Sequence, residues 1–325
     1  MTDRIIVLDG HALNPGDLDW SPFAGLGSLE LHERTPEAEV VARAGGAGCV
    51  LLNKTPMSRA TLARLPALRY IGVLATGYNV VDLQAAREQG ITVTNIPTYG
   101  TDSVAQHAAA MMLEFARGLT VHERAVREGE WTRNPDWCFA RRPMFELNGR
   151  TLALIGLGRI GLAFGRIAAS MGMRLVAHDP YFPSRDALGG LDIAPVSLED
   201  AFAQGDVISL HCPLTADNRH LINRERLLRM KRTALIINTS RGPLIDQDAL
   251  AAALREGLIG GASLDVLDTE PPPAGNPLIG APNCIVTPHI AWYAIEARKR
   301  LMQIAADNLA AFQRGAPVNT VNPAG

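Results

Sequence analysis

Short apolar runs alternate with amphipathic stretches along most of the chain. In the first hundred residues, the runs predicted to be β-strands cover residues 4–10, 49–52, 68–75 and 91–97. Stretches with helical spacing lie between them, at residues 35–44 and 81–90, and the second ends at a glycine, as helices often do. This alternation is typical of parallel strands with helices on both faces of the sheet.

A long helix is predicted over residues 101–119. Its start carries the capping side chains of Thr101, Asp102 and Ser103, and apolar residues then recur at helical spacing. His107 lies within this helix. We favour a structural role for it, because no second metal ligand stands three or four residues further along the helix.

A second alternating series begins at residue 151. Six strand-like runs with helical spacers form a complete doubly wound set that ends at residue 289, and a last helical stretch follows at residues 294–313. The simplest architecture is two α/β domains, one inserted into the other. We expect residues 101–289 to form the inserted domain, and residues 1–100 with 290–325 to form the other.

Composition narrows the class of protein. A length of 325 residues suggests about two domains, and 47% apolar residues supply their cores. Because 31 basic side chains balance 33 acidic ones and no basic run occurs, we expect no nucleic-acid partner. The apolar run near the N-terminus is too short for a signal sequence, and no run approaches the ~18 residues of a membrane span, so we expect no membrane association.

The four cysteines, Cys49, Cys138, Cys212 and Cys284, lie far apart and form no C-x-x-C pair. We therefore expect neither disulfides nor a zinc site, and no metal is predicted. Free thiols fit a reducing, cytoplasmic location.

A glycine-rich motif opens the second series. Gly156, Gly158 and Gly161 have G-x-G-x-x-G spacing, follow an apolar strand and begin an amphipathic helix. In this context the first glycine allows a tight turn, the second admits a pyrophosphate to the backbone, and the third lets helix and strand pack closely. The free N–H groups at the start of the helix suit the same anion.

The cofactor predicted for this motif is NAD. The strand over residues 174–178 leads into Asp179, which can accept hydrogen bonds from the adenosine ribose and would repel a 2′-phosphate. Arg185 leaves NADP open as an alternative, if its loop folds back towards the ribose. Glycines that serve tight packing alone are the other interpretation of the motif.

Ligands of open α/β sheets bind at the carboxyl ends of the strands, so the residues that end the strands are candidate site residues. They are His211, Cys212 and Pro213; Thr239, Ser240 and Arg241; Asp265 and Glu270; and Thr287, Pro288 and His289. Three of these strand ends bring Arg, Glu and His to one rim.

These three residue types suit the reduction of a 2-keto acid. Arg241 offers a planar fork for a carboxylate and can polarise the keto oxygen. His289 can donate the proton that accompanies a hydride from the nicotinamide, and Glu270 can favour the imidazolium and fix the ring's tautomer. A surface ion pair for Arg241, a solvated loop acid for Glu270, a strand-end cap for Asp265 and a core role for His289 are the alternatives. Trp292, close to His289 in sequence, is a candidate wall for the substrate.

Six segments resemble the D-isomer-specific 2-hydroxyacid dehydrogenase family and cover nearly the whole chain. They are "TGYNVVDLQAA", "VTNIPTYGTDSVAQHA", "ELNGRTLALIGLGRIG", "NTSRGPLIDQDALAAAL", "GASLDVLDTEPP" and "TPHIAW". The resemblance implies a Rossmann NAD-binding domain inserted into a flavodoxin-like substrate domain, with the active site in the cleft. It also implies a homodimer built on the cofactor domain, and it places the family's catalytic trio on Arg241, Glu270 and His289.

The resemblance also implies binding residues. The family's cofactor contacts fall on Thr76, Arg159, Ile160, Asp179, Cys212, Thr239, Arg241, Asp265 and His289. Its backbone amides for the substrate carboxylate fall on Leu74, Ala75, Thr76 and Gly77. Many members have glycine where this chain has Ala75, a departure that puts the path of this loop in doubt.

Within the family, the segments "YGTDSVAQH", "NPDWCF" and "HIAW" are most similar to the glycerate dehydrogenase, or hydroxypyruvate reductase, branch. Glu270 argues against a formate dehydrogenase, because those members carry Gln at this position. Residues 120–148, with Trp131, Trp137 and Phe139, resemble the family's dimerisation arm, and simple surface packing is the alternative. Trp137 is a candidate to reach the partner subunit's active site.

The function expected from the sequence is thus the interconversion of hydroxypyruvate or glyoxylate with D-glycerate or glycolate, with NAD as cofactor. Another 2-keto acid reductase of the family, or a phosphite dehydrogenase, is the alternative enzyme. An NAD(H)-sensing regulator similar to the family's transcriptional corepressors is the alternative of another class.

Overall fold

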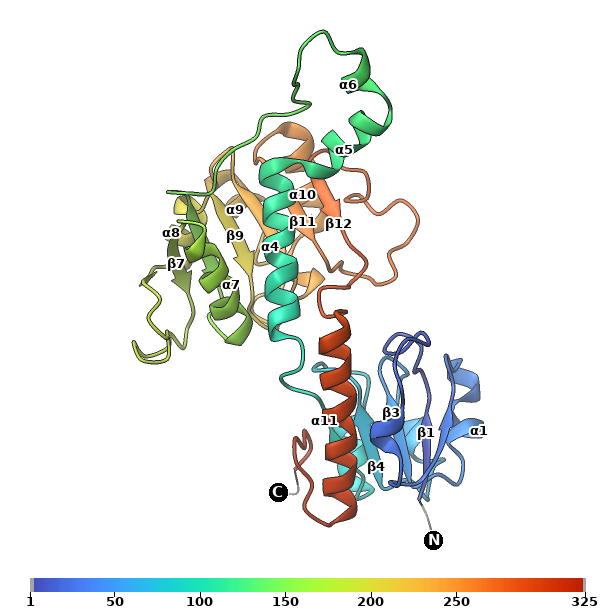
Figure 1. Ribbon diagram of the computed structural model, residues 1–325. Coiled ribbons are helices and arrows are strands. Elements are labelled where there is room, and N and C mark those ends of the chain that lie inside the picture. Colours follow the sequence, from blue (N-terminus) through green and yellow to red (C-terminus); the bar gives the residue numbers. More distant parts are fainter. Residues whose placement is uncertain (1–2, 324–325) are drawn as a thin grey trace. The chain divides into compact units, whose positions relative to one another are not determined.

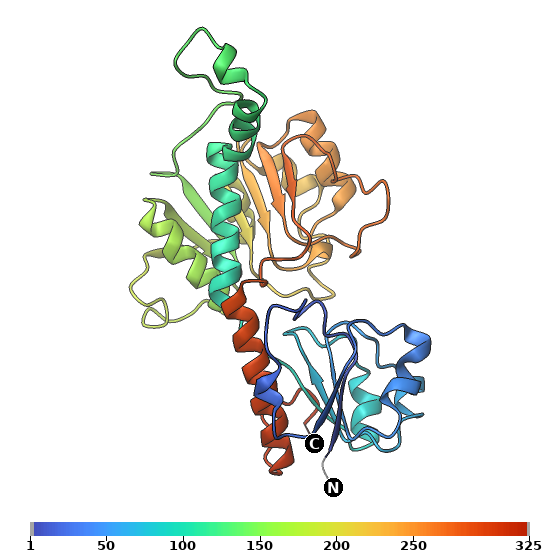
Figure 2. The ribbon, with the colours of Figure 1, turned by 45° about the vertical axis from the view of Figure 1, so that its right-hand side comes forward.

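The computed structural model describes residues 3–323, which form two compact units. One unit comprises the described residues up to 100 together with those from 293 onward, and the other comprises residues 101–292 (Figures 1 and 2). In both units the paired strands run parallel and helices connect them. The predicted fold class, doubly wound α/β, is confirmed.

The first unit is built on a five-stranded sheet of order β2-β1-β3-β4-β5. Its strands are β1 (Arg4–Val7), β2 (Ser28–Leu31), β3 (Cys49–Leu52), β4 (Tyr70–Val73) and β5 (Thr92–Thr94). Its helices are α1 (Val40–Ala44), α2 (Arg59–Leu62), α3 (Leu83–Glu88) and α11 (Ile295–Gln313), with short 3-10 turns at Ser21–Phe23 and Glu37–Glu39. This strand order is that of flavodoxin-like sheets.

Helix α11 belongs to this first sheet although it lies at the other end of the sequence. It packs against β4, where the ring of Phe312 lies 4.8 Å from that of Tyr70. Strand β2 was not predicted. It is an edge strand with no fully buried residue, so it lacks the apolar run that identified the others.

The second unit is built on a seven-stranded sheet of order β12-β11-β10-β9-β6-β7-β8. Its strands are β6 (Thr151–Ile155), β7 (Arg174–His178), β8 (Ile193–Pro195), β9 (Val207–Leu210), β10 (Leu235–Asn238), β11 (Gly261–Leu264) and β12 (Cys284–Val286). Strand order reverses at β6, which pairs with β7 on one side and β9 on the other. This is the Rossmann arrangement, and its reversal point is where dinucleotides bind.

The helices of the second unit are α4 (Thr101–Arg117), α5 (Leu119–Arg127), α6 (Glu130–Arg133), α7 (Arg159–Ser170), α8 (Leu198–Gln204), α9 (Arg224–Arg229) and α10 (Gln247–Glu256). A 3-10 turn at Gly242–Leu244 follows β10. The helix predicted at residues 101–119 ends at Arg117, because Gly118 has the left-handed φ of 60° and a new helix starts after it. Strand β8 was missed, since it has one buried residue and ends in a proline.

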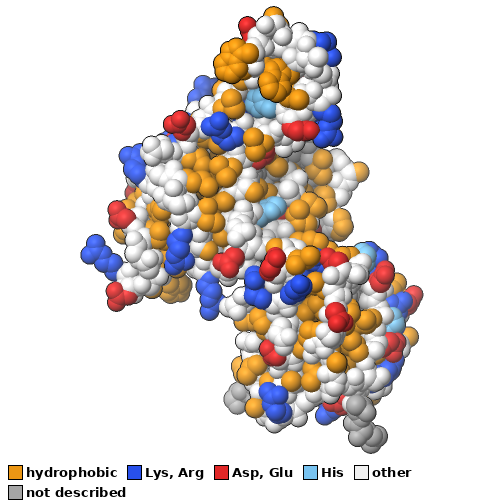
Figure 3. All heavy atoms as spheres, in the orientation of Figure 1, with side chains coloured by type: hydrophobic (Ala, Val, Ile, Leu, Met, Phe, Trp, Pro, Cys, Tyr) orange, Lys and Arg blue, Asp and Glu red, His pale blue; other side chains and the backbone are white. Residues whose placement is uncertain are grey.

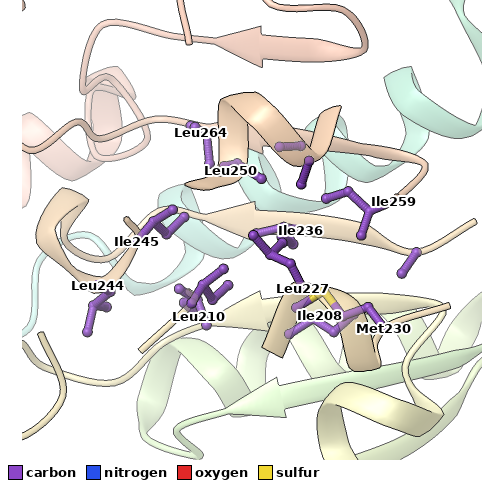
Figure 4. Packing of buried hydrophobic residues seen from close by; sticks show 14 of the residues in the cluster. Ile208, Leu210, Leu227, Met230, Ile236, Leu244, Ile245, Leu250, Ile259 and Leu264 are labelled. Carbon is purple, nitrogen blue, oxygen red and sulfur yellow. The ribbon is translucent and has the colours of Figure 1, made fainter. Parts of the chain in front are cut away.

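Two apolar layers fill this unit. On one face of the sheet, strand residues such as Ile208, Leu210 and Ile236 pack against Leu227 of α9 and Leu250 of α10 (Figure 4). On the other face, α4 and α7 cover the sheet. The four central strands are fully buried, so their ends are held in fixed register. No helix in the described part of the chain is both long and apolar enough to cross a membrane.

Candidate active site

The glycine-rich loop connects β6 to α7 at the reversal point of the sheet. Gly156 has φ of 96°, and a Cβ on it would lie 2.6 Å from the backbone nitrogen of Cys212. A Cβ on Gly161 would lie 2.4 Å from the carbonyl oxygen of Gly156, whereas one on Gly158 would meet nothing within 4 Å. The first and third glycines are therefore required by packing, and the second leaves open space in front of α7.

Asp179, which follows β7, holds this loop through its carboxylate. One carboxylate oxygen accepts the N–H of Leu157 at 2.6 Å, and the other accepts the N–H of Tyr181 at 2.7 Å. The sequence indicated only the contact with the ribose. Since a carboxylate has about four acceptor positions, these two bonds leave capacity for ribose hydroxyls.

The loop after β10 carries a polar atom that lacks a partner. Thr239 Oγ1 is buried and has no hydrogen-bond partner within residues 3–323. Ser240 Oγ, beside it in sequence, donates to the carbonyl of Cys212 at 2.5 Å. A buried hydroxyl without a partner is costly, and a bound dinucleotide would supply one. The open space at Gly158 and the orphaned Thr239 hydroxyl together fit NAD.

Two other candidates near this loop are excluded from proton chemistry. Desolvation lowers the pKa of His211 to about 4, and its Nε2 lies 2.9 Å from Ser209 Oγ. Desolvation also raises the pKa of the Cys212 thiol to about 11. His211 is therefore neutral near pH 7 and Cys212 is a thiol rather than a thiolate, so neither is a general acid or a nucleophile. Pro213 follows them in an exposed loop.

His289 and Glu270 form a direct pair. His289 Nδ1 lies 2.6 Å from Glu270 Oε2, and each side chain is about one third exposed, at 33%. The other carboxylate oxygen of Glu270 accepts the N–H of Leu267 at 3.0 Å, which fixes the carboxyl group. Because Nδ1 faces a carboxylate, it is assigned the proton, and Nε2 is the ring nitrogen left to act on a substrate.

Arg241 lies at the same edge of the sheet. β10, β11 and β12 are adjacent and parallel, and Arg241, Glu270 and His289 follow them in that order. Arg241 is exposed, its Nη1 donates to the carbonyl of Ser240 at 2.8 Å, and within the described residues it forms no ion pair. Its fork is thus available to a ligand carboxylate.

A buried asparagine that the sequence did not single out sets the position of Arg241. Asn238 is fully buried, its side chain donates to the carbonyl of Arg241 at 2.9 Å, and it accepts the N–H of Ser240 at 3.0 Å. The signal available in the sequence was an amide side chain at the end of an otherwise apolar strand.

Asp265 is buried behind His289. Its oxygens accept Thr287 Oγ1 at 2.6 Å and the N–H groups of Ile290 and Ala291 at 2.9 and 2.8 Å. Trp292 Nε1 donates to the carbonyl of His289 at 2.9 Å. Asp265 therefore caps the strand end, and Asp265 and Trp292 together hold the main chain around His289.

Leu74, Ala75, Thr76 and Gly77 follow β4 in the first unit. Leu74 is buried, and the hydroxyl of Thr76 donates to the carbonyl of Ile96 at 2.8 Å. The amides of Ala75, Thr76 and Gly77 donate to no other residue between positions 3 and 323. Consecutive free N–H groups of this kind bind anions. Arg159 and Ile160 lie in the first turn of α7.

Comparisons with known proteins agree with this geometry. Residues 109–291 match the model of the D-isomer specific 2-hydroxyacid dehydrogenase NAD binding domain. The chain is 49% identical to a hydroxypyruvate reductase of Blautia hydrogenotrophica, over 98% of this chain and 99% of that protein. It is 41% identical to a glycerate dehydrogenase of Methylorubrum extorquens, over 99% of each.

Solved structures show the same relationship. The TT0316 protein from Thermus thermophilus superposes with a TM-score of 0.85 at 37% identity, over 98% of this chain and 99% of that one. The D-lactate dehydrogenase from Escherichia coli superposes with a TM-score of 0.83 at 33% identity, over the same shares. This chain therefore belongs to the D-isomer specific 2-hydroxyacid dehydrogenase family.

Proposed function

We propose that this protein reduces hydroxypyruvate to D-glycerate, or glyoxylate to glycolate, with NADH, and catalyses the reverse oxidation. The observation that carries the proposal is the 2.6 Å pair of His289 and Glu270 on the sheet edge that also presents Arg241. Relatives named hydroxypyruvate reductase, glycerate dehydrogenase and, in Korarchaeum cryptofilum at 38% identity, glyoxylate reductase support this substrate class.

The residues of the pair handle the proton. NADH supplies the hydride when it is bound. His289 donates a proton from Nε2 to the keto oxygen during reduction and accepts it during oxidation. Glu270 holds Nδ1, so that it keeps the ring oriented with Nε2 directed to the substrate.

Carboxylate binding is assigned to two sets of donors. Arg241 offers its bidentate fork at the end of β10 and polarises the keto oxygen. The free amides that follow β4, at Ala75, Thr76 and Gly77, are the second set. Leu74 positions that loop, and Trp292 is proposed as a wall of the substrate site.

Cofactor binding is assigned to the loops at the reversal point of the second sheet. The proposed contacts are Thr76, Gly156, Gly158, Arg159, Ile160, Gly161, Asp179, Cys212, Pro213, Thr239, Ser240, Arg241, Asp265 and His289. Asp179, at the end of β7, favours NAD over NADP because it would repel a 2′-phosphate. We propose residues 101–289 as the cofactor domain, and residues 1–100 with 290–325 as the substrate domain; the compact units themselves divide between Trp292 and Tyr293.

We further propose a homodimer in the cytoplasm. Apolar side chains are exposed along α5 and α6 and the segment after them, including Leu119, Val126, Trp131 and Trp137, which is 86% exposed. Figure 3 shows hydrophobic side chains gathered at that end of the second unit. Exposed apolar area of this extent favours association with a second copy. Four free cysteines support a reducing compartment.

The test is a steady-state panel that follows NADH and NADPH consumption with hydroxypyruvate, glyoxylate, pyruvate and 2-ketogluconate, and NADH formation from NAD⁺ with phosphite. Turnover that is highest with hydroxypyruvate or glyoxylate and NADH supports the proposal. Preference for another keto acid or for phosphite would move the protein to another branch of the family. No consumption with any substrate, together with tight NADH binding, would favour the regulator.

A further inference from the structure

The segment that carries His289 has an unusual backbone. His289 has φ of 55°, in the left-handed region that residues other than glycine rarely adopt. Such a conformation persists only where surrounding bonds hold it. On one side, Asp265 supplies them: its carbonyl accepts the N–H of His289 at 2.9 Å, and its carboxylate accepts those of Ile290 and Ala291.

Helix α4 supplies two more bonds to the same segment. Ser103 Oγ donates to the carbonyl of Ala291 at 2.6 Å, and His107 Nε2 lies 3.1 Å from Thr287 Oγ1. Ser103 and His107 are four residues apart, so they lie on one face of the helix. That helix packs against β10 and β11 in the second unit (Figure 1).

The direction of these bonds follows from the number of protons. The hydroxyl of Thr287 has one hydrogen, and the 2.6 Å contact with Asp265 Oδ1 takes it, because that buried carboxylate is an acceptor. At 3.1 Å from His107 the same hydroxyl must then accept, so His107 carries its proton on Nε2. His107 Nε2 also lies 3.6 Å from Asp265 Oδ1. The chain of bonds runs from His107 through Thr287 to Asp265.

We propose that His107 is a positioning residue for His289, and that it acts through Thr287 and Asp265. By donating to the Thr287 hydroxyl, it orients the hydrogen bond that this hydroxyl makes to Asp265. Asp265 in turn fixes the amides on both sides of the ring. This inference rests on the proposed function, since it assigns His107 a role in placing the proton donor. The sequence indicated only that His107 has a structural role, and the inference specifies which residues that role supports.

The variants that test it change this donor alone. His107→Leu removes the donor at similar volume, and His107→Gln retains an N–H group close to the position of Nε2. Gln106→Leu, at the exposed neighbouring position on α4, is the matched control. Thr287→Val removes the bridging hydroxyl, and Thr287→Ser keeps it.

For His107→Leu with hydroxypyruvate we expect kcat to fall about tenfold, the rate effect of losing a hydrogen bond worth about 1.4 kcal/mol. The KM for substrate and the Kd for NADH should stay within about twofold, and His107→Gln should recover most of kcat. Thr287→Val should resemble His107→Leu, and adding both changes should cost little more than either alone, because they break one chain of bonds. Equal kcat in wild type and His107→Leu, both folded, would overturn the inference while leaving the proposed function intact.

A second measurement does not depend on turnover. Hydrogen exchange of the cofactor-free protein should show faster exchange at Ile290 and Ala291 in His107→Leu, with no change in β9. Gln106→Leu and His107→Gln should exchange as wild type does. Unchanged exchange at these two amides would also overturn the inference, even if no keto acid were turned over at all.

Discussion

Replacing Glu270 with Gln leaves one acceptor where the structure has two donors. In the unchanged protein, the N–H of Leu267 and Nδ1 of His289 contact different oxygens of the Glu270 carboxylate, at 3.0 and 2.6 Å. A glutamine has a single carbonyl oxygen, so either the loop amide or the imidazole must face an NH2 group. If the amide oxygen keeps the N–H of Leu267, the NH2 group faces Nδ1, which must then be the unprotonated acceptor, so a protonated ring loses its partner.

The magnitude follows from the kind of bond that is lost. A hydrogen bond to a charged group contributes about 1.5–3 kcal/mol, and partial exposure of this pair places it near the middle, at about 2 kcal/mol. If this interaction is made in the transition state, kcat falls roughly 30-fold. The effect on stability is expected to be small, because each side chain is about one third exposed, at 33%.

The assay is NADH consumption with saturating hydroxypyruvate, together with thermal unfolding of each variant. Asp268→Asn is the matched control. Asp268 lies in the same loop as Glu270, but its carboxylate pairs with Arg219 and not with His289. We expect Asp268→Asn to keep kcat within about twofold of wild type. A kcat for Glu270→Gln equal to that of the control would refute the role of the pair in proton transfer.

Three further predictions test the other residues. His289→Asn should lower kcat by about 10² to 10⁴-fold in keto-acid reduction while NADH still binds, and near-normal turnover would remove His289 from the mechanism. Arg241→Lys should raise the KM for the keto acid by about tenfold, because a lysine cannot form the bidentate fork; unchanged KM and kcat would contradict the anchor. In the unfolded chain His211 takes up a proton near pH 6.5, but in the folded protein only near pH 4, so stability should fall as the pH drops through this window, by at most about 3 kcal/mol. In thermal unfolding scans, the melting temperature of His211→Gln should fall less than that of wild type over this pH range. Equal falls in melting temperature for both proteins would argue against a contribution from His211.

The sequence predicted the parts of the fold that repeat a strong pattern. Buried parallel strands such as β3 and β10 are apolar runs, broken in β10 only by Asn238 at its end, and the predicted bounds of β3, residues 49–52, match the structure. Strands β2 and β8 were missed because β2 has no fully buried residue and β8 has one, so neither contains an apolar run like those of β5 and β12, which are also edge strands. The end of α4 was placed two residues late, since an apolar residue follows Gly118 and the pattern alone does not show its left-handed turn.

The candidate site was predictable where chemistry and position coincide. Arg241, Glu270 and His289 follow three neighbouring strands, and parallel strands bring their carboxyl ends to one edge. What the sequence did not show is which side chain bonds to which backbone amide. Asn238 bonds to the backbone of Ser240 and Arg241, close by in sequence, whereas Thr287 donates to the carboxylate of Asp265, 22 positions away.

The acids at the strand ends show how support and chemistry are divided. Asp9, beyond β1, accepts the N–H groups of residues 53–55, and Asp179, beyond β7, accepts that of Leu157. Asp265, beyond β11, accepts those of Ile290 and Ala291. Each carboxylate thus fixes a loop at the edge where parallel strands leave amide groups without partners. One oxygen of Glu270 likewise accepts a loop amide, the N–H of Leu267, and the other contacts the imidazole ring of His289. The other three acids support loops only, whereas a histidine that follows the next strand reaches the second oxygen of Glu270, and this contact is the reason for which we assign Glu270 to the proposed proton transfer.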